Sequence, residues 1–328
     1  MLNVFKISDD KLIINGMQVS ALANPGGKAY FVDGDNGSDT QSGRSWNKAT
    51  ATIAQAVSLA SANDSIYVLA KDMAAGATDP ESYAETVTIP AGKSRLRLIG
   101  VSNGATQGGL PQMKIGAGST AMLTVRAPGV LIDGIGFNGA SSTGGGILLD
   151  DDASTKSAFG VTVRGCHFKN CKGHSTNGTL GGGVTWAAAG GAWQVLIENN
   201  EFYGNLAGVV LVGTSSSRPK DVTIRKNRFG AGAATDVDVY IYGAGGSAFN
   251  DVAIYDNQFT TVLPAKASGS VVRYMDLTGV ASGIVANNYF AGIYTTAGFG
   301  AAKDAAKIPT AVGMPHNYSD SGLIVREA

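Results

Sequence analysis

Three consecutive carboxylates are the densest group of potentially reactive side chains in the sequence. Asp150, Asp151 and Asp152 follow the apolar run GILL, and Lys172 is a basic side chain a little further along the chain. Carboxylate oxygens suit calcium binding or general acid–base catalysis, and a lysine can act as a base. Asp runs in Ser/Thr-rich loops also form ordinary solvated turns. The four residues are therefore weak candidates for a catalytic site.

Other ionisable groups are scattered. Asp236 and Asp238 precede the apolar run VYIY, and Lys169 and His174 flank Lys172. His167 falls between Cys166 and Phe168 at a position that the repeat described below predicts to face outward, so we expect a surface residue. No metal or cofactor motif is present, and we expect neither a metal site nor a cofactor.

The two cysteines, Cys166 and Cys171, are too few for a disulfide framework and lack zinc-ligand spacing. We expect buried thiols in a chain made in a reducing cytoplasm. Trp186, Trp193 and Tyr203 are candidates for stacking on sugar rings, although the alternation around Trp186 equally predicts core packing.

Composition limits the classes of partner. Hydrophobic residues make up 44% of the 328 residues, charged residues only 15%, and Gly occurs 46 times. Twenty-five basic and 25 acidic residues give a formal net charge of zero, which argues against nucleic acid or an anionic membrane as partner. No run reaches the ~18 apolar residues of a membrane span, and the start shows no signal peptide.

The middle of the chain repeats one pattern. Each copy alternates apolar and variable residues, as a half-buried strand does, and five copies end in a polar residue and Phe. The six segments are VLIDGIGF (130–137), VTVRGCHF (161–168), VLIENNEF (195–202), VTIRKNRF (222–229), VAIYDNQF (252–259) and GIVANNYF (283–290). A second short strand follows most copies, for example GGILL and GGVTW. The pattern predicts a parallel β-helix whose coils stack and leave no lateral sheet edge.

Stacking places equivalent residues above one another at the inter-strand spacing of ~4.8 Å. We therefore predict two structural columns. An Asn two residues before each Phe should form a ladder at a turn with left-handed backbone, and the Phe rings should form the other column. The predicted members are Asn200, Asn227, Asn257 and Asn288, with Phe202, Phe229, Phe259 and Phe290.

A third column is charged. Asp133, Arg164, Glu198 and Arg225 share one variable position and alternate in sign from copy to copy. We expect them to face outward and to form ion pairs between coils. This interpretation removes them from the catalytic candidates.

The N-terminal part carries a family resemblance. YFVDGDNGSDTQSGRSWNKATATIAQAV, followed by DSIYVLA and VTIPAGKSRLRLIG, resembles the first segment of pectin-lyase-like right-handed β-helix proteins. It implies an all-β, single-stranded right-handed parallel β-helix (solenoid) with an N-terminal capping helix, for which 51–62 is the most helical stretch. We divide the chain into an anchor segment and linker (1–28), the β-helix (29–299) and a C-terminal tail or cap (300–328).

The resemblance leaves function open, because the superfamily includes polysaccharide lyases, hydrolases, phage tailspikes and structural virion proteins. In its lyases a carboxylate cluster holds calcium beside a basic residue, and its hydrolases use two or three Asp. No such motif matches here residue by residue. We favour a bacteriophage virion protein, a head decoration, fibre or spike component. The alternatives are a tailspike or secreted polysaccharide lyase or hydrolase, and a non-catalytic glycan-binding β-helix.

The favoured interpretation carries expectations about partners. It places the chain in the virion after synthesis in the host cytoplasm, as a homotrimer. Residues 1–28 and 300–328 would contact other capsid or tail proteins, and a host-surface glycan is a further candidate ligand. We expect no nucleic-acid binding and no membrane insertion.

Overall fold

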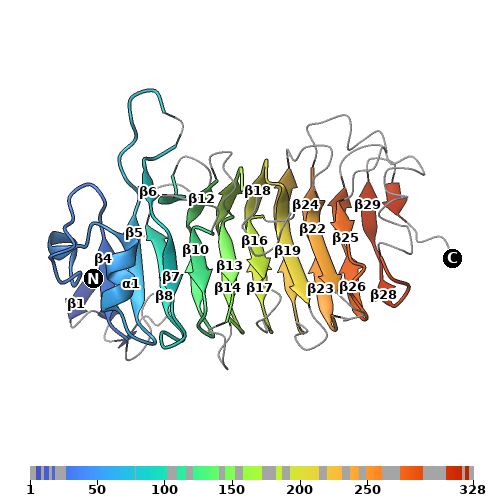
Figure 1. Ribbon diagram of the computed structural model, residues 1–328, viewed down its shortest axis with the longest axis horizontal. Helices are drawn as coiled ribbons and strands as arrows, with labels where there is room; N and C mark the ends of the chain where they lie inside the picture. The colour runs from blue at the N-terminus through green and yellow to red at the C-terminus, as the bar shows by residue number, and fades with distance from the viewer. Residues whose placement is uncertain are drawn as a thin grey trace.

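The chain winds into a stack of coils, each built from up to three short strands (Figure 1). The computed structural model describes the strands within 5–18 as backbone. Beyond them it describes residues 27–77, 79–101, 109–115, 121–139, 145–151, 158–171, 182–186, 193–213, 220–230, 237–243, 249–260, 274–290, 308–319 and 322–324. The colours in Figure 1 run in order along the long axis, so each coil contacts mainly its neighbours. The prediction of an all-β parallel β-helix is confirmed.

Three parallel sheets form the walls, and each is named here by its first strand. The β4 sheet contains β4 (Ala29–Val32), β5 (Ser65–Leu69), β8 (Arg97–Val101), β11 (Leu131–Asp133), β14 (Thr162–Arg164), β17 (Leu196–Glu198), β20 (Thr223–Arg225), β23 (Val252–Tyr255), β26 (Gly283–Ala286) and β28 (Val312–Gly313). The β7 sheet contains β7 (Val87–Ile89), β10 (Leu123–Val125), β13 (Ile147–Leu149), β16 (Val184–Trp186), β19 (Ala207–Gly213), β22 (Val237–Gly243) and β25 (Met275–Asp276).

The β6 sheet is the third wall. Its parallel strands are β6 (Ser82–Ala84), β9 (Gln112–Lys114), β12 (Gly136–Asn138), β15 (His167–Lys169), β18 (Glu201–Tyr203), β21 (Arg228–Gly230), β24 (Gln258–Phe259), β27 (Tyr289–Phe290) and β29 (Asn317–Ser319). A last strand, β30 (Gly322–Ile324), pairs with β29 in the antiparallel sense. A separate antiparallel sheet is formed by β1 (Phe5–Ser8), β2 (Lys11–Ile14) and β3 (Met17–Gln18).

A two-residue turn connects the β4 sheet to the β6 sheet in six consecutive coils. Asn199 and Asn200, between β17 and β18, are one example. The first turn residue always has positive φ, for example 55° at Asn199 and 57° at Asp256. We predicted the left-handed backbone at the ladder Asn itself; it lies one residue earlier. Gly or a short polar residue occupies that position in most coils because the left-handed region disfavours a bulky side chain.

The second turn residue forms the asparagine ladder. The Nδ2 of Asn227 donates to Ile197 O at 2.9 Å and to Asn257 Oδ1 at 3.0 Å. Its Oδ1 accepts from the N and Nδ2 of Asn200, both at 3.0 Å. The same bonds recur at the other rungs, and the column of buried amides is Asn200, Asn227, Asn257, Asn288 and Asn317. Each buried turn therefore has its backbone groups satisfied by the next coil.

The phenylalanines form a continuous stack inside the coil. Neighbouring rings have centroids 4.7 to 4.9 Å apart and planes within 4° to 8° of parallel. Six rings take part: Phe137, Phe168, Phe202, Phe229, Phe259 and Phe290. Each aromatic pair contributes about 0.5–1.5 kcal/mol beyond its buried area. The stack is set by strand register, since Phe168 lies opposite Phe137 and Phe202 in the β6 sheet.

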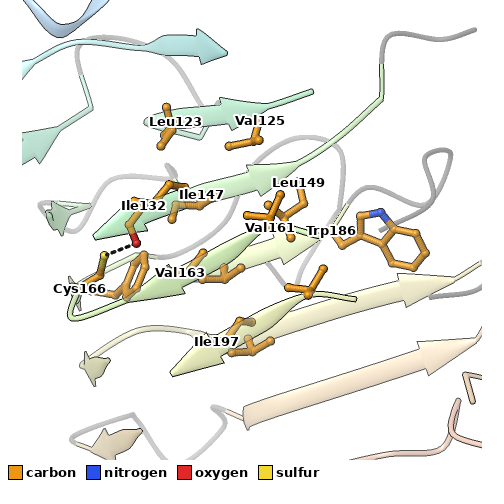
Figure 2. Packing of buried hydrophobic residues seen from close by; sticks show 14 of the residues in the cluster. Leu123, Val125, Ile132, Ile147, Leu149, Val161, Val163, Cys166, Trp186 and Ile197 are labelled. Carbon is orange, nitrogen blue, oxygen red and sulfur yellow. Dashed lines mark hydrogen bonds between the residues drawn. The ribbon is translucent and has the colours of Figure 1, made fainter. Parts of the chain in front are cut away.

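Aliphatic columns fill the rest of the interior. Figure 2 shows side chains of the β4 sheet, such as Ile132, Val163 and Ile197, facing those of the β7 sheet, such as Leu123 and Ile147. All five are completely buried. Because register repeats from coil to coil, apolar residues meet their equivalents and no mismatched layer is created.

The N-terminal end is closed by α1 (Ile53–Leu59) and by a 3₁₀ turn, Trp46–Lys48. The side chain of Thr52 caps the helix by accepting a hydrogen bond from Gln55 N at 3.1 Å. Ile53 and Val57 lie on its buried face, and the helix contacts β4, β5 and β7. An N-terminal capping helix was predicted and is present.

The C-terminal end differs from the division at residue 299. β28 pairs in parallel with β26, and β29 with β27, so the stack continues through residue 319. Asn317 belongs to the ladder: its Oδ1 accepts from Asn288, and its Nδ2 donates to Val285 O at 2.8 Å. Only β30 breaks the parallel pattern.

We predict that Asn227→Ala lowers the free energy of unfolding by about 1–3 kcal/mol, because it leaves Asn200 N and Ile197 O buried without partners. Arg225→Ala, in the same coil, should cost less because its bond to Glu198 lies on the outside. Urea unfolding followed by circular dichroism measures both. The reverse order would mean that the inward and outward roles are exchanged.

Cys166 occupies the ladder position one coil before Asn200. Its thiol accepts from Ile135 N–H and lies 3.9 Å from Ile132 O, and its own N donates to Asn200 Oδ1. An amide there would extend the ladder, so Cys166→Asn should raise the free energy of unfolding by about 0.5–1.5 kcal/mol. Cys166→Ala is the matched control and should give no gain. Equal stabilities of the two variants would contradict the prediction.

Candidate functional site

The aspartate run lies at the end of β13, where the β7 sheet ends and the chain turns toward the β4 sheet. Asp150 forms an ion pair with Arg126 of the preceding coil, with 2.9 Å between Oδ2 and Nε. Its side chain is only 17% exposed. Asp151 makes a backbone bridge, and Asp152 and Lys172 lie outside the described residues. The part of the site that is described is therefore a carboxylate neutralised within the chain.

The other acidic candidates do not join it. Asp238 is a buried residue of β22, three coils further along the β7 sheet, whereas Asp236 and His174 lie outside the described residues. Among the residues that the structure describes, no three His, Cys, Asp or Glu side chains are arranged to hold a metal ion. A metal-dependent mechanism thus has no described ligand set to support it.

The charged column faces outward, and its members pair within the chain. Arg164 donates to Asp133 at 2.8 Å, and Arg225 bonds to Glu198 at 2.6 Å and to Tyr255 at 3.0 Å. The column forms two separate pairs, Asp133 with Arg164 and Glu198 with Arg225, and Arg164 is not bonded to Glu198. The hydrogen bonds of Arg225 to Tyr255 and Glu198 raise its pKa above the usual value. The column joins neighbouring coils by ion pairs.

His167 was predicted to be a surface residue, and this prediction is wrong because its side chain is buried. Its side chain is on the outer face of β15 but only 3% exposed, and Lys169 of the same strand is 8% exposed. Lys169 forms an ion pair with Asp79 of the segment between β5 and β6. Burial lowers the pKa of His167 below its ordinary value, and nearby Lys169 lowers it further. No sequence signal marked this contact, because Asp79 and Lys169 are far apart in the chain.

The predicted thiols are buried. Desolvation raises the pKa of Cys166 and of Cys171 to about 12, so neither is a reactive nucleophile. Cys171 repeats the geometry of Cys166: its N donates to Asn205 Oδ1 at 2.8 Å. Asn205 is a second ladder-like amide that the repeat pattern did not reveal.

The three aromatic candidates separate. Trp186 is buried against Phe249 in an edge-on contact, whereas Trp193 is 51% and Tyr203 47% exposed. Tyr289 and Tyr318, which pair in register on the β6 sheet, are exposed as well. Trp193 stands at the corner before β17 and Tyr203 on the outer face of the β6 sheet. The exposed tyrosines thus share the β6 sheet, whereas Trp193 lies apart from them at the corner before β17.

The connections between sheets differ in length. In the six consecutive coils from β11 to β27, those from the β4 sheet to the β6 sheet are two-residue turns, as at 165–166 and 226–227. Those that lead from the β6 sheet to the β7 sheet vary widely, from two or three residues at 85–86 and 204–206 to fourteen and fifteen at 170–183 and 260–274. The corner between the β4 and β6 sheets is therefore uniform over these six coils, while connection length varies beside the β7 sheet. No described helix is long and apolar enough to cross a membrane.

Comparisons with known proteins agree with this architecture. The family model for a right handed beta helix region matches residues 145–302. A solved structure, ORF18 of Geobacillus virus E2, is 14% identical, with a TM-score of 0.54 over 86% of this chain and 55% of the viral one. This chain therefore spans about half the length of that viral protein.

The chain has a right-handed parallel β-helix fold. A pectin methylesterase from Aspergillus niger is also similar, with 14% identity, a TM-score of 0.42 and coverage of 90% of this β-helix and 84% of the enzyme. A rhamnogalacturonan lyase is 13% identical with a TM-score of 0.45, over 81% and 74% of the two chains. No curated protein sequence matches the β-helix.

The Asp150 ion pair generates a prediction about calcium. Since Arg126 already neutralises this carboxylate, we expect the melting temperature of the β-helix to be the same in calcium and in EDTA. Differential scanning fluorimetry measures this directly. A stabilisation by calcium that Asp150→Asn abolishes, and that the control Asp133→Asn retains, would identify a calcium site at the aspartate run.

Proposed function

We propose that this β-helix is a structural component of a bacteriophage particle, acting as a homo-oligomeric decoration, fibre or spike protein. The observation that carries the proposal is the use of side chains in the described coils. The Asn and Phe columns run through the stack, and the outward charges of the column are paired within the chain. An interior of stacked columns, with outward charges that are paired within the chain, suits a rigid structural rod better than a catalyst.

The candidate carboxylate supports the same conclusion. Asp150 is bound to Arg126, and no metal-binding group of three occurs among the described residues. A general acid or base must reach its substrate with a tuned pKa. The Asp150 carboxylate instead already has a partner, the guanidinium of Arg126 in the neighbouring coil. Its geometry is that of a link between coils.

The viral assignment rests on the chain's character and on occurrence of the fold. ORF18 of Geobacillus virus E2 shares the fold, so a viral protein uses this architecture. The formal net charge of zero and the low charged content of 15% leave little repulsion between identical copies. Such a surface favours close packing of several copies on a particle.

The termini are the proposed attachment points. β1, β2 and β3 form their own antiparallel sheet, and β30 leaves the parallel pattern at the other end. Neither element continues a wall of the coil in the parallel sense, so both can be used for contacts with other chains. We propose a homotrimer held through residues 1–28 and the residues after 319, with capsid or tail proteins as further partners.

A non-catalytic glycan-binding role is the second candidate. The exposed indole of Trp193 and the phenol ring of Tyr203 favour it, because exposed aromatic faces stack on sugars. This role is compatible with a virion location, since a particle protein can also contact host-surface glycans.

Sedimentation equilibrium of the full chain tests the assembly. We expect a mass about three times the chain mass of 33.4 kDa. Removal of residues 1–28 should leave the circular dichroism of the β-helix intact but lower the oligomer mass. Mass spectrometry of purified particles that encode the chain should detect it as a stoichiometric component. A monomer that cleaves acidic polysaccharides and is absent from particles would contradict the proposal.

A further inference from the structure

A long excursion leaves the coil between β5, which ends at Leu69, and β6, which begins at Ser82. We call residues 70–81 the strap; all but residue 78 are described. In Figure 1 it stands out from the stack between β5 and β6. A connection of this length is expected to carry a role beyond joining two strands.

The base of the strap is fixed. Asp72 N donates to Asp35 Oδ2 at 2.7 Å, and Glu81 N donates to Asp72 O at 3.0 Å. Lys71 lies 3.8 Å from Asp35 and 3.7 Å from Glu81. These contacts close the two ends of the strap against each other, so that its far part can move while its base stays in place.

The far part of the strap contacts a distant coil. Asp79 forms an ion pair with Lys169 of β15. In the β6 sheet, the order β6-β9-β12-β15 places β15 three strands from β6, a separation of about 14 Å at ~4.8 Å per strand. The strap thus reaches along the outer face of the sheet, and this ion pair is a contact that joins coils not adjacent in the stack.

An ionisable group is buried beside that contact. His167 is 3% exposed, and its Nε2 has no hydrogen-bond partner among the residues that the structure describes. The charged groups that face it are Lys169 on its own strand, Glu201 on β18 and Asp79 on the strap. Burial, the largest effect, and Lys169 both disfavour the protonated imidazole, while the two carboxylates favour it.

We propose that the strap is an acid-released clasp, in which protonation of His167 detaches residues 70–81 from β15 and exposes Lys169. The closed strap holds a neutral imidazole in a dry position next to an ammonium group. Opening admits water, and water solvates both cations. This proposal does not depend on the proposed function as a particle protein.

The direction follows from the two states of the clasp. Burial lowers the pKa of His167 while the strap is closed, and in the open state it returns toward ~6.5. The open state therefore binds the extra proton, and opening becomes more favourable as pH falls below ~6.5.

Hydrogen exchange of strap amides between pH 7.5 and 5.5 tests the proposal. After correction for intrinsic exchange, the opening equilibrium of the full chain should rise about five- to tenfold across this range. Amides of β17 and β20, far along the stack, should not change. His167→Gln, which cannot titrate, should change less than twofold, and His167→Asn should behave alike, which guards against a steric effect of one substitution.

Two lysines of the same outer row provide matched controls. Lys169→Met removes the partner of Asp79 and should raise strap exchange at pH 7.5. Lys114→Met alters an exposed lysine of β9 in that row and should leave it unchanged. The proposal is overturned by a flat profile of the unaltered chain, by a pH response in both His167 variants as large as that of the unaltered chain, or by unchanged strap protection in Lys169→Met.

Discussion

The rest of the structure depends on the two-residue turn between the β4 and β6 sheets. A turn this short cannot satisfy its own buried backbone groups, and burial without partners would cost about 1–3 kcal/mol for each group. The second residue of the turn solves this by hydrogen bonding to the coil before it, as Asn227 does with Asn200 and Ile197. Because each amide needs its neighbour at the same height, the turn fixes the register of both adjoining strands. The Phe stack and the aliphatic columns follow from that register.

Register also decides what the outer surface can do. With equivalent positions one strand spacing apart, opposite charges on neighbouring coils meet, as Asp133 and Arg164 do. The same geometry brings Arg126 to Asp150 from the preceding coil. Charges that would be free to act on a ligand in a less regular fold are thus used to join coils. Variation remains where connection length is free, beside the β7 sheet, and there a ligand-binding function would not disturb the ladder.

The sequence is sufficient to predict the structural features that repeat from coil to coil. Segments ending in Asn-x-Phe were sufficient to place Asn200 through Asn288 at one position, and the structure brings them together. Asn317 was not predicted as a ladder member, because Ser319 replaces Phe in its copy and two prolines interrupt the preceding strand pattern. The left-handed residue was predicted one position too late, since Asn tolerates that backbone and stands at both turn positions in some copies. The burial of His167 was not predicted for a different reason. Alternation predicts to which side of the sheet a strand residue points, but not whether a distant loop lies over it.

The strap shows why such a contact can be marginal where the ladder is not. A ladder rung is supported by the rungs above and below, so its loss is opposed by the whole stack. The Asp79–Lys169 contact joins coils that register does not align, and it has no repeated neighbour to support it. Local charge and burial contribute to its stability, and these are the quantities that protonation of one imidazole changes. A rigid solenoid can therefore carry a reversible element on its surface, provided that the element lies outside the repeat and leaves the turn amides untouched.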